Sequence, residues 1–90
     1  MTLIERLRAA TEGSRDLDYA VAEHIRRKTV PLDWTTSIDD AAALVPATTF
    51  WGIGYYPGEA CAWVGCEANV DAATPALALC IAALMAQGIK

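Results

Sequence analysis

The sequence predicts a small α+β domain with a short antiparallel sheet and about four helices, of which the C-terminal one is buried. The first observation is a β-hairpin pattern: Thr48–Tyr56 is rich in β-branched and aromatic residues, Pro57-Gly58 is a turn signal, and Glu59–Cys66 supplies the partner strand. The second is a set of amphipathic helical patterns before the hairpin, and the third is an uncharged helical pattern after it. The chain has 90 residues, so we expect a single domain over residues 1–90.

The first helix is expected over about Thr2–Thr11. Its apolar residues recur at helical spacing, Thr2 is a capping residue, and Glu5 stands at the position that completes a capping box. Gly13 suits the left-handed residue that commonly ends a helix. We therefore expect the chain to turn at Gly13 and to enter a second helix directly.

The second helix is expected over about Arg15–Arg27, with Ser14 as its cap. Acidic residues lie in its first turns and basic residues in its last, which is the order that the helix dipole favours. The connection between the first two helices is short, so they are expected to form an αα-hairpin or corner. The basic cluster Arg26-Arg27-Lys28 is interpreted as the solvated end of this helix.

A third, shorter helix is expected from Thr36 or Ser37 to about Leu44, with Asp39 and Asp40 in its first turn. Pro46 follows and closes it. Carboxylates stabilise a helix at its N-terminus, so we interpret these two residues as dipole-stabilising rather than catalytic.

Aromatic residues concentrate in the predicted hairpin. Alternation along the first strand places Trp51, Ile53 and Tyr55 on one face, and we expect Trp63 of the second strand to share that face. The surface formed by Trp51, Tyr55 and Trp63 is either core beneath a helix layer or an exposed interaction surface. A short third strand over Glu67–Ala72 is an additional option.

The last helix begins after Thr74, its cap, with Pro75 in the first helical position, and Gly88 is expected to stop it. From Ala76 to Ala86 it has no charged residue, and a helix that is apolar on all sides must be covered on all sides. Either the first two helices wrap it or a second copy of the protein does. The second option predicts dimer contacts through Ala78, Ala82 and Met85.

Three stretches together resemble the phage ABA sandwich family of small phage and prophage proteins: Leu3–Leu7 with Ala9–Asp18, Thr35–Pro46, and Ala73–Cys80. The resemblance implies three α/β/α layers, in which helices cover both faces of a small antiparallel sheet. The family has no established activity, so the resemblance implies no catalytic residues. The connection Arg27–Trp34 is shorter here than in many members, so a site that depends on that loop is not expected to carry over.

Charge and composition exclude several classes of protein. The net charge is −4 and the pI is about 4.7, whereas nucleic-acid binding requires a basic surface. The longest uncharged run, Ala72–Ile89, is rich in alanine and contains Pro75, so we expect no membrane span. The three cysteines include no CxxC pair and no signal peptide is evident, which favours reduced thiols in the cytoplasm of a bacterial host.

No group of residues predicts catalysis, a metal or a cofactor. The groups considered are His24, the pairs Asp16/Asp18 and Asp39/Asp40, the thiols Cys61, Cys66 and Cys80, and Gly52-x-Gly54. The carboxylates lie at helix N-termini, the cysteines lack the paired spacing of zinc ligands, and the glycines lie within a strand rather than a phosphate loop. We therefore expect a protein that is not an enzyme.

Three functions remain. The first is a phage or prophage accessory protein that binds another protein, with inhibition of a host defence system as a sharper variant. The second is a self-assembling structural domain, a homodimer through the hairpin edge or the aromatic face, without a separate ligand. The third is a small-molecule binder using His24, Asp39, Asp40 or Cys61, and it has the least support in the sequence.

Overall fold

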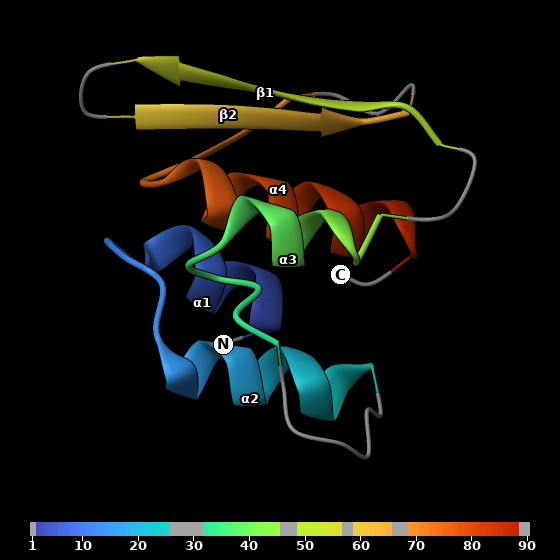
Figure 1. Cartoon of the computed structure of the whole chain (residues 1–90). Coiled ribbons are helices and arrows are strands. Elements are labelled where there is room, and N and C mark those ends of the chain that lie inside the picture. Colours follow the sequence, from blue (N-terminus) through green and yellow to red (C-terminus); the bar gives the residue numbers. More distant parts are fainter. Residues whose placement is uncertain (1, 26–31, 46–48, 57–58, 66–68, 89–90) are drawn as a thin grey trace.

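A computed structural model describes residues 2–25, 32–45, 49–56, 59–65 and 69–88, and it has three layers. Figure 1 shows the sheet as one outer layer, α3 and α4 side by side beneath it, α1 next to α4, and α2 farthest from the sheet. In chain order the elements are α1 (Leu3–Ala9), α2 (Arg15–His24), α3 (Ile38–Ala42), β1 (Trp51–Tyr56), β2 (Glu59–Val64), β3 (Val70–Ala72) and α4 (Pro75–Ala86). The predicted α+β class, with four helices and a small antiparallel sheet, is confirmed.

The helices begin where the sequence places their caps. In each of the four, a hydroxyl at the N-cap accepts a hydrogen bond from the backbone N–H three residues later, over 3.2–3.3 Å; the caps are Thr2, Ser14, Ser37 and Thr74. Each bond satisfies a donor that the first helical turn cannot pair internally. Gly88, which follows α4, has φ +88° and stops that helix as expected. The expected end of the second helix, residues 26–27, lies outside the described residues.

Gly13 does not have the role that the sequence suggested. Helix α1 already ends at Ala9, since the backbone of its C-cap Ala10 is extended, and Gly13 is not among the described glycines with positive φ. A Cβ at Gly13 would lie only 1.8 Å from the carbonyl oxygen of Thr35. The residue must be glycine because two backbone segments touch there, which is a tertiary requirement rather than a helix-ending one.

The sheet is a meander with the order β1-β2-β3. In the hairpin Tyr56 lies opposite Glu59 and Trp51 opposite Val64, and the optional third strand forms over Val70–Ala72. The first part of that expected strand, residues 67–68, lies outside the described residues. β2 is the central strand, so β1 is an edge strand, and no other described strand pairs with its outer side.

The expected order of layers is wrong: the sheet lies outside the helices instead of between two helical layers (Figure 1). The central position belongs to α4, which packs against all three strands on one side and against α1 and α3 on others. Because α4 is apolar all round, it is the element that gains most from complete enclosure. The second face of the sheet is consequently left without a helix among the described residues.

The chain's own elements cover α4, so a second copy is not needed to bury it. Ala78 and Ala82 are 0% and 1% exposed within one chain, and the prediction that they form a dimer contact is therefore wrong. Only Met85 of that set reaches the surface, at 39% exposure. In the described part of the chain, no helix combines the length and apolarity needed to cross a bilayer.

Candidate functional site

The outward surface of the sheet, here called the outer sheet face, collects side chains from all three strands. Directly paired residues of antiparallel strands project to the same side of the sheet, so the register defines this surface. It consists of Gly52 and Gly54 from β1, Glu59, Cys61 and Trp63 from β2, and Asp71 from β3. Trp63 is 37% exposed there, and both carboxylates are exposed.

The indole of Trp63 packs against Gly52 of β1. Its partner in the register is Gly52, and a Cβ placed on Gly52 would lie 2.5 Å from Cζ2 and 2.7 Å from Cε2 of the indole. Because Gly52 has no side chain, the Trp63 ring can approach the backbone of β1 this closely. Part of the indole stays exposed on the outer sheet face, where Cys61 contributes a half-buried thiol.

The expected common face of Trp51, Tyr55 and Trp63 is wrong. Trp51 pairs with Val64, and Tyr55 pairs with Ala60, so both project toward the helices while Trp63 projects away from them. The alternation along each strand was predicted correctly, and the error concerns how the two strands are matched. The signal was available: a two-residue turn at Pro57-Gly58 pairs Tyr56 with Glu59, and counting back from that pair places Trp63 opposite Gly52.

Residues of β1 that project toward the helices are nevertheless not covered. Trp51, Ile53 and Tyr55 are 39%, 38% and 70% exposed, because β1 is the edge strand and α4 lies mainly beneath β2. Phe50, just before the strand, is also exposed. The hairpin thus has two distinct surfaces: the outer sheet face, with Trp63 and two carboxylates, and the apolar β1 edge, formed by Trp51, Ile53 and Tyr55.

The sheet half of the molecule is acidic. Between Thr49 and Gly88 the sequence contains Glu59, Glu67 and Asp71 but no Lys, Arg or His. On the outer sheet face, Asp71 lies opposite Cys61, and Glu59 lies two residues before Cys61 on the same strand. An aromatic ring on a face whose described charged side chains are both carboxylates attracts positively charged groups.

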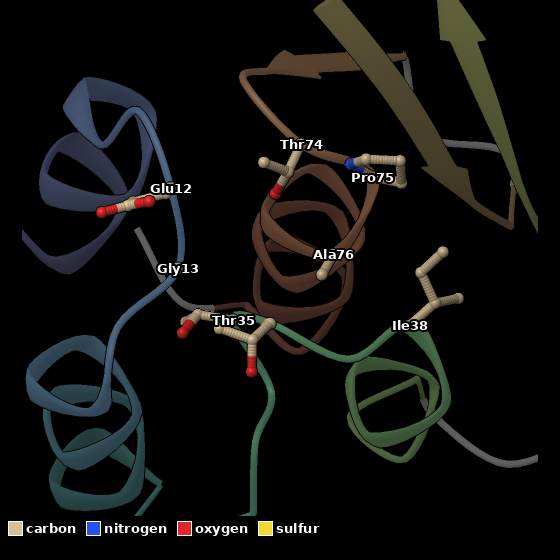
Figure 2. Close-up of a pocket in the computed structure, with 8 residues that line it drawn as sticks. Glu12, Gly13, Thr35, Ile38, Thr74, Pro75 and Ala76 are labelled. Atoms are coloured by element: carbon tan, nitrogen blue, oxygen red, sulfur yellow. The ribbon is translucent and has the colours of Figure 1, made fainter.

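A hollow of about 290 Å³ lies where α4 begins, between the connection of α1 to α2 and the segment before α3 (Figure 2). Its lining includes Glu12, Thr35, Ile38 and Thr74. The hydroxyls are already engaged, since Thr74 caps α4 and Thr35 bonds to neighbouring elements. The lining holds no imidazole or thiol, so no nucleophile and base are brought together there.

Beside this hollow, Asp18 joins α2 to the segment before α3. The residue is only 2% exposed, and its Oδ1 accepts hydrogen bonds from the Thr35 backbone N–H at 2.9 Å and from the Thr35 hydroxyl at 2.8 Å. The same hydroxyl lies 3.0 Å from the Ser14 carbonyl oxygen and accepts from the Ser14 N–H at 3.0 Å. Asp18 is therefore a structural anchor, whereas the sequence had indicated only a dipole-stabilising role.

The surroundings of Asp18 include a guanidinium and a buried thiol. Arg15 reaches Asp18 Oδ2 at 3.6 Å and Asp33 Oδ1 at 3.2 Å, and half of its side chain is exposed. The Cys80 thiol donates to the Trp34 carbonyl oxygen at 2.8 Å. Burial, with a smaller contribution from the charge of Asp18, raises the pKa of the Cys80 thiol, so this cysteine is an inert core residue.

The remaining candidates for chemistry lie apart. His24 is exposed at the end of α2, Asp39 and Asp40 lie in the first turn of α3, and Cys61 lies on the sheet. Asp40 accepts a hydrogen bond from the Asp33 backbone N–H at 3.0 Å. Among the described residues, no three His, Cys, Asp or Glu side chains are grouped so that they could hold a metal ion. Cys66 and the cluster Arg26-Arg27-Lys28 lie outside the described residues.

Comparisons of the chain with protein-family models, with curated proteins and with solved structures gave no match. The resemblance to the phage ABA sandwich family therefore stays a prediction from the sequence.

Proposed function

We propose that this chain is a small phage- or prophage-encoded accessory protein that acts by binding another protein through the outer sheet face. The observation that carries the proposal is Trp63, a large aromatic side chain held on a sheet face that no described helix covers. Tryptophan is among the residues that contribute most to protein–protein affinity. The resemblance of Thr35–Pro46 and the other two stretches to phage proteins supports the proposed origin.

The charge of the outer sheet face supports a partner with basic side chains. Glu59 and Asp71 project from the same face of the sheet as Trp63, and the sheet half of the chain has no basic residue up to Gly88. An Arg or Lys of the partner would stack on the indole and pair with a carboxylate, two interactions that reinforce each other. Inhibition of a host defence protein is one form that this binding would take.

A pull-down from host lysate tests the proposal when it is combined with two matched variants. Trp63→Ala removes the outer aromatic ring, and Tyr19→Ala removes a still more exposed ring from α2, on the side of the molecule away from the sheet. A partner purified from the pull-down should bind Trp63→Ala at least about tenfold more weakly and Tyr19→Ala with unchanged affinity. Raising the salt concentration should weaken the wild-type complex, because salt screens charge pairs.

The proposal fails if the immobilised protein captures nothing reproducibly. It also fails if a captured protein binds Trp63→Ala as tightly as it binds the wild type. Circular dichroism of both variants establishes that they are folded before the affinities are compared.

Self-assembly is a second candidate function, and the open β1 edge favours it. An edge strand presents unpaired backbone groups, and exposed apolar edges promote pairing between copies. This candidate uses a different surface from the outer sheet face, so the two functions are compatible in one molecule.

A further inference from the structure

The β1 edge has a defined set of free backbone groups. Phe50 accepts a hydrogen bond from the Gly65 N–H on the neighbouring strand, over 2.6 Å. Because backbone groups alternate in direction along an antiparallel strand, those of Gly52 and Gly54 also point toward β2. The N–H and C=O groups of Trp51, Ile53 and Tyr55 therefore point away from the sheet, where no described strand pairs with them.

The sequence of this edge is symmetric by residue class. From Phe50 to Tyr56 it reads aromatic, aromatic, Gly, Ile, Gly, aromatic, aromatic, and the order is the same in the reverse direction. Two identical strands that pair antiparallel about Ile53 would place Trp51 opposite Tyr55, Gly52 opposite Gly54, and Ile53 opposite its own copy. A two-fold interface requires this kind of self-complementarity.

We propose that the partner of the β1 edge is a second copy of this chain, bound by antiparallel pairing of the two β1 strands with the two-fold axis at Ile53. The inference rests on self-assembly, the second candidate function above. The two sheets join into one, and Ile53 exchanges backbone hydrogen bonds with Ile53 of the second copy. In this register the new hydrogen bonds are made by the residues whose backbone groups point away from the sheet. Ile53 is the middle one of these residues, and it is also the centre of the symmetric sequence.

The side chains along the β1 edge favour the same pairing. Trp51, Ile53 and Tyr55 are each more than a third exposed in one chain, and cross-strand contacts with the same residues of the second copy would cover them. Aromatic and β-branched pairs of this kind stabilise a sheet. No residue from Thr49 to Tyr56 is charged, so the pairing brings no like charges together along the strand, although the net charge of each chain is −4.

A charge-pair experiment tests the register directly. Ile53→Lys and Ile53→Glu each place like charges opposite each other at the two-fold axis, and each variant alone should be a monomer by sedimentation. An equimolar mixture of the two variants should form the dimer again, whereas Ile53→Val should remain dimeric like the wild type. Ile53 is 38% exposed, so a charged side chain can reach solvent in the free monomer.

A cross-linking experiment tests the same register without introducing charge. Opposed residues in a hydrogen-bonded antiparallel pair have Cα atoms about 5.5 Å apart, which is a disulfide distance. In a Cys61→Ser/Cys66→Ser background, Ile53→Cys should form a disulfide-linked dimer at least about tenfold faster than Tyr19→Cys, which lies on α2. Equal rates at the two positions would overturn the proposal.

A wild-type protein that is monomeric up to about 1 mM would also overturn it, as would single-charge variants that stay dimeric or a mixture that does not reassociate. These outcomes are distinct from failure of the proposed function. Trp63→Ala should remain dimeric, and Ile53→Lys should still bind a basic partner, because Trp63 lies on the other side of the sheet.

Discussion

The indole of Trp63 covers Gly52 so closely that a Cβ on the glycine would lie 2.5 Å from the ring. The pair is a direct consequence of the hairpin register, in which the two residues lie opposite each other. Its effect is that the indole of Trp63 packs against the backbone of β1 while more than a third of the side chain stays exposed. A substitution at Gly52 is therefore expected to change the orientation of Trp63 without unfolding the protein.

Gly52→Ala should displace the Trp63 ring while leaving the protein folded. The contact involves the outer part of the indole, which can move, and alanine is favoured over glycine in a strand by about 0.5–1 kcal/mol. We expect the free energy of unfolding to change by less than about 1 kcal/mol and the indole N–H resonance of Trp63 to shift. Because the ring moves, Gly52→Ala should also weaken partner binding. In a Trp63→Ala background, which has no ring to displace, Gly52→Ala should cause no further loss of affinity. An additive loss there would contradict this interpretation.

Asp18→Ala should destabilise the fold by about 2–4 kcal/mol, because it leaves the Thr35 N–H buried without its acceptor. Thr35→Val removes only the hydroxyl and should cost less, about 1–2 kcal/mol. Urea unfolding of both variants and of the double variant measures the coupling. Asp16→Ala, an exposed neighbour in the same first turn, is the matched control and should change stability by less than about 0.5 kcal/mol.

Stability should fall at high pH in a way that depends on Cys80. The unfolded chain loses the proton of this thiol near pH 8.5, whereas burial raises its pKa in the folded protein. Above pH 8.5 the unfolded state therefore binds fewer protons than the folded state, and the free energy of unfolding falls by about 1.4 kcal/mol per pH unit. At pH 10 the loss amounts to about 2 kcal/mol relative to lower pH.

Cys80→Ser is the control for this dependence, since serine keeps a donor for the Trp34 carbonyl and does not ionise. Urea unfolding at pH 7.5 and pH 10 should show a smaller decrease in the variant than in the wild type. Equal decreases in the two proteins would mean that other groups cause the pH dependence.

Ala82→Glu should prevent folding, with a destabilisation of more than about 4 kcal/mol, because the site is enclosed by the same chain and would bury an unpaired charge. Met85→Glu, one turn further along α4, should be tolerated within about 1 kcal/mol because the side chain is 39% exposed. Circular dichroism and thermal unfolding distinguish the two. A folded Ala82→Glu protein would show that α4 is not enclosed.

Local signals predicted the elements well, because a cap or a turn acts within a few residues. Ser14 and Thr74 accept hydrogen bonds from backbone groups three residues away, so their roles do not depend on the rest of the fold. The two-residue turn likewise determines that Trp63 lies opposite Gly52. Alternation within each strand does not determine which faces of the two strands coincide, and for that reason Trp63 was placed on the wrong face. The residues that share the outer sheet face could therefore have been predicted from the sequence.

By itself, the sequence determined the helix starts, the hairpin and the need to enclose α4. Only the tertiary structure decided that α4 lies beneath the sheet and against α1 and α3, which leaves the other face of the sheet uncovered. It also decided that residue 13 must be glycine, because the Thr35 carbonyl group lies where a side chain would be, and that Asp18 is buried. The physical reason is that burial and close backbone approach depend on residues distant in the chain, whereas caps and turns depend on neighbours.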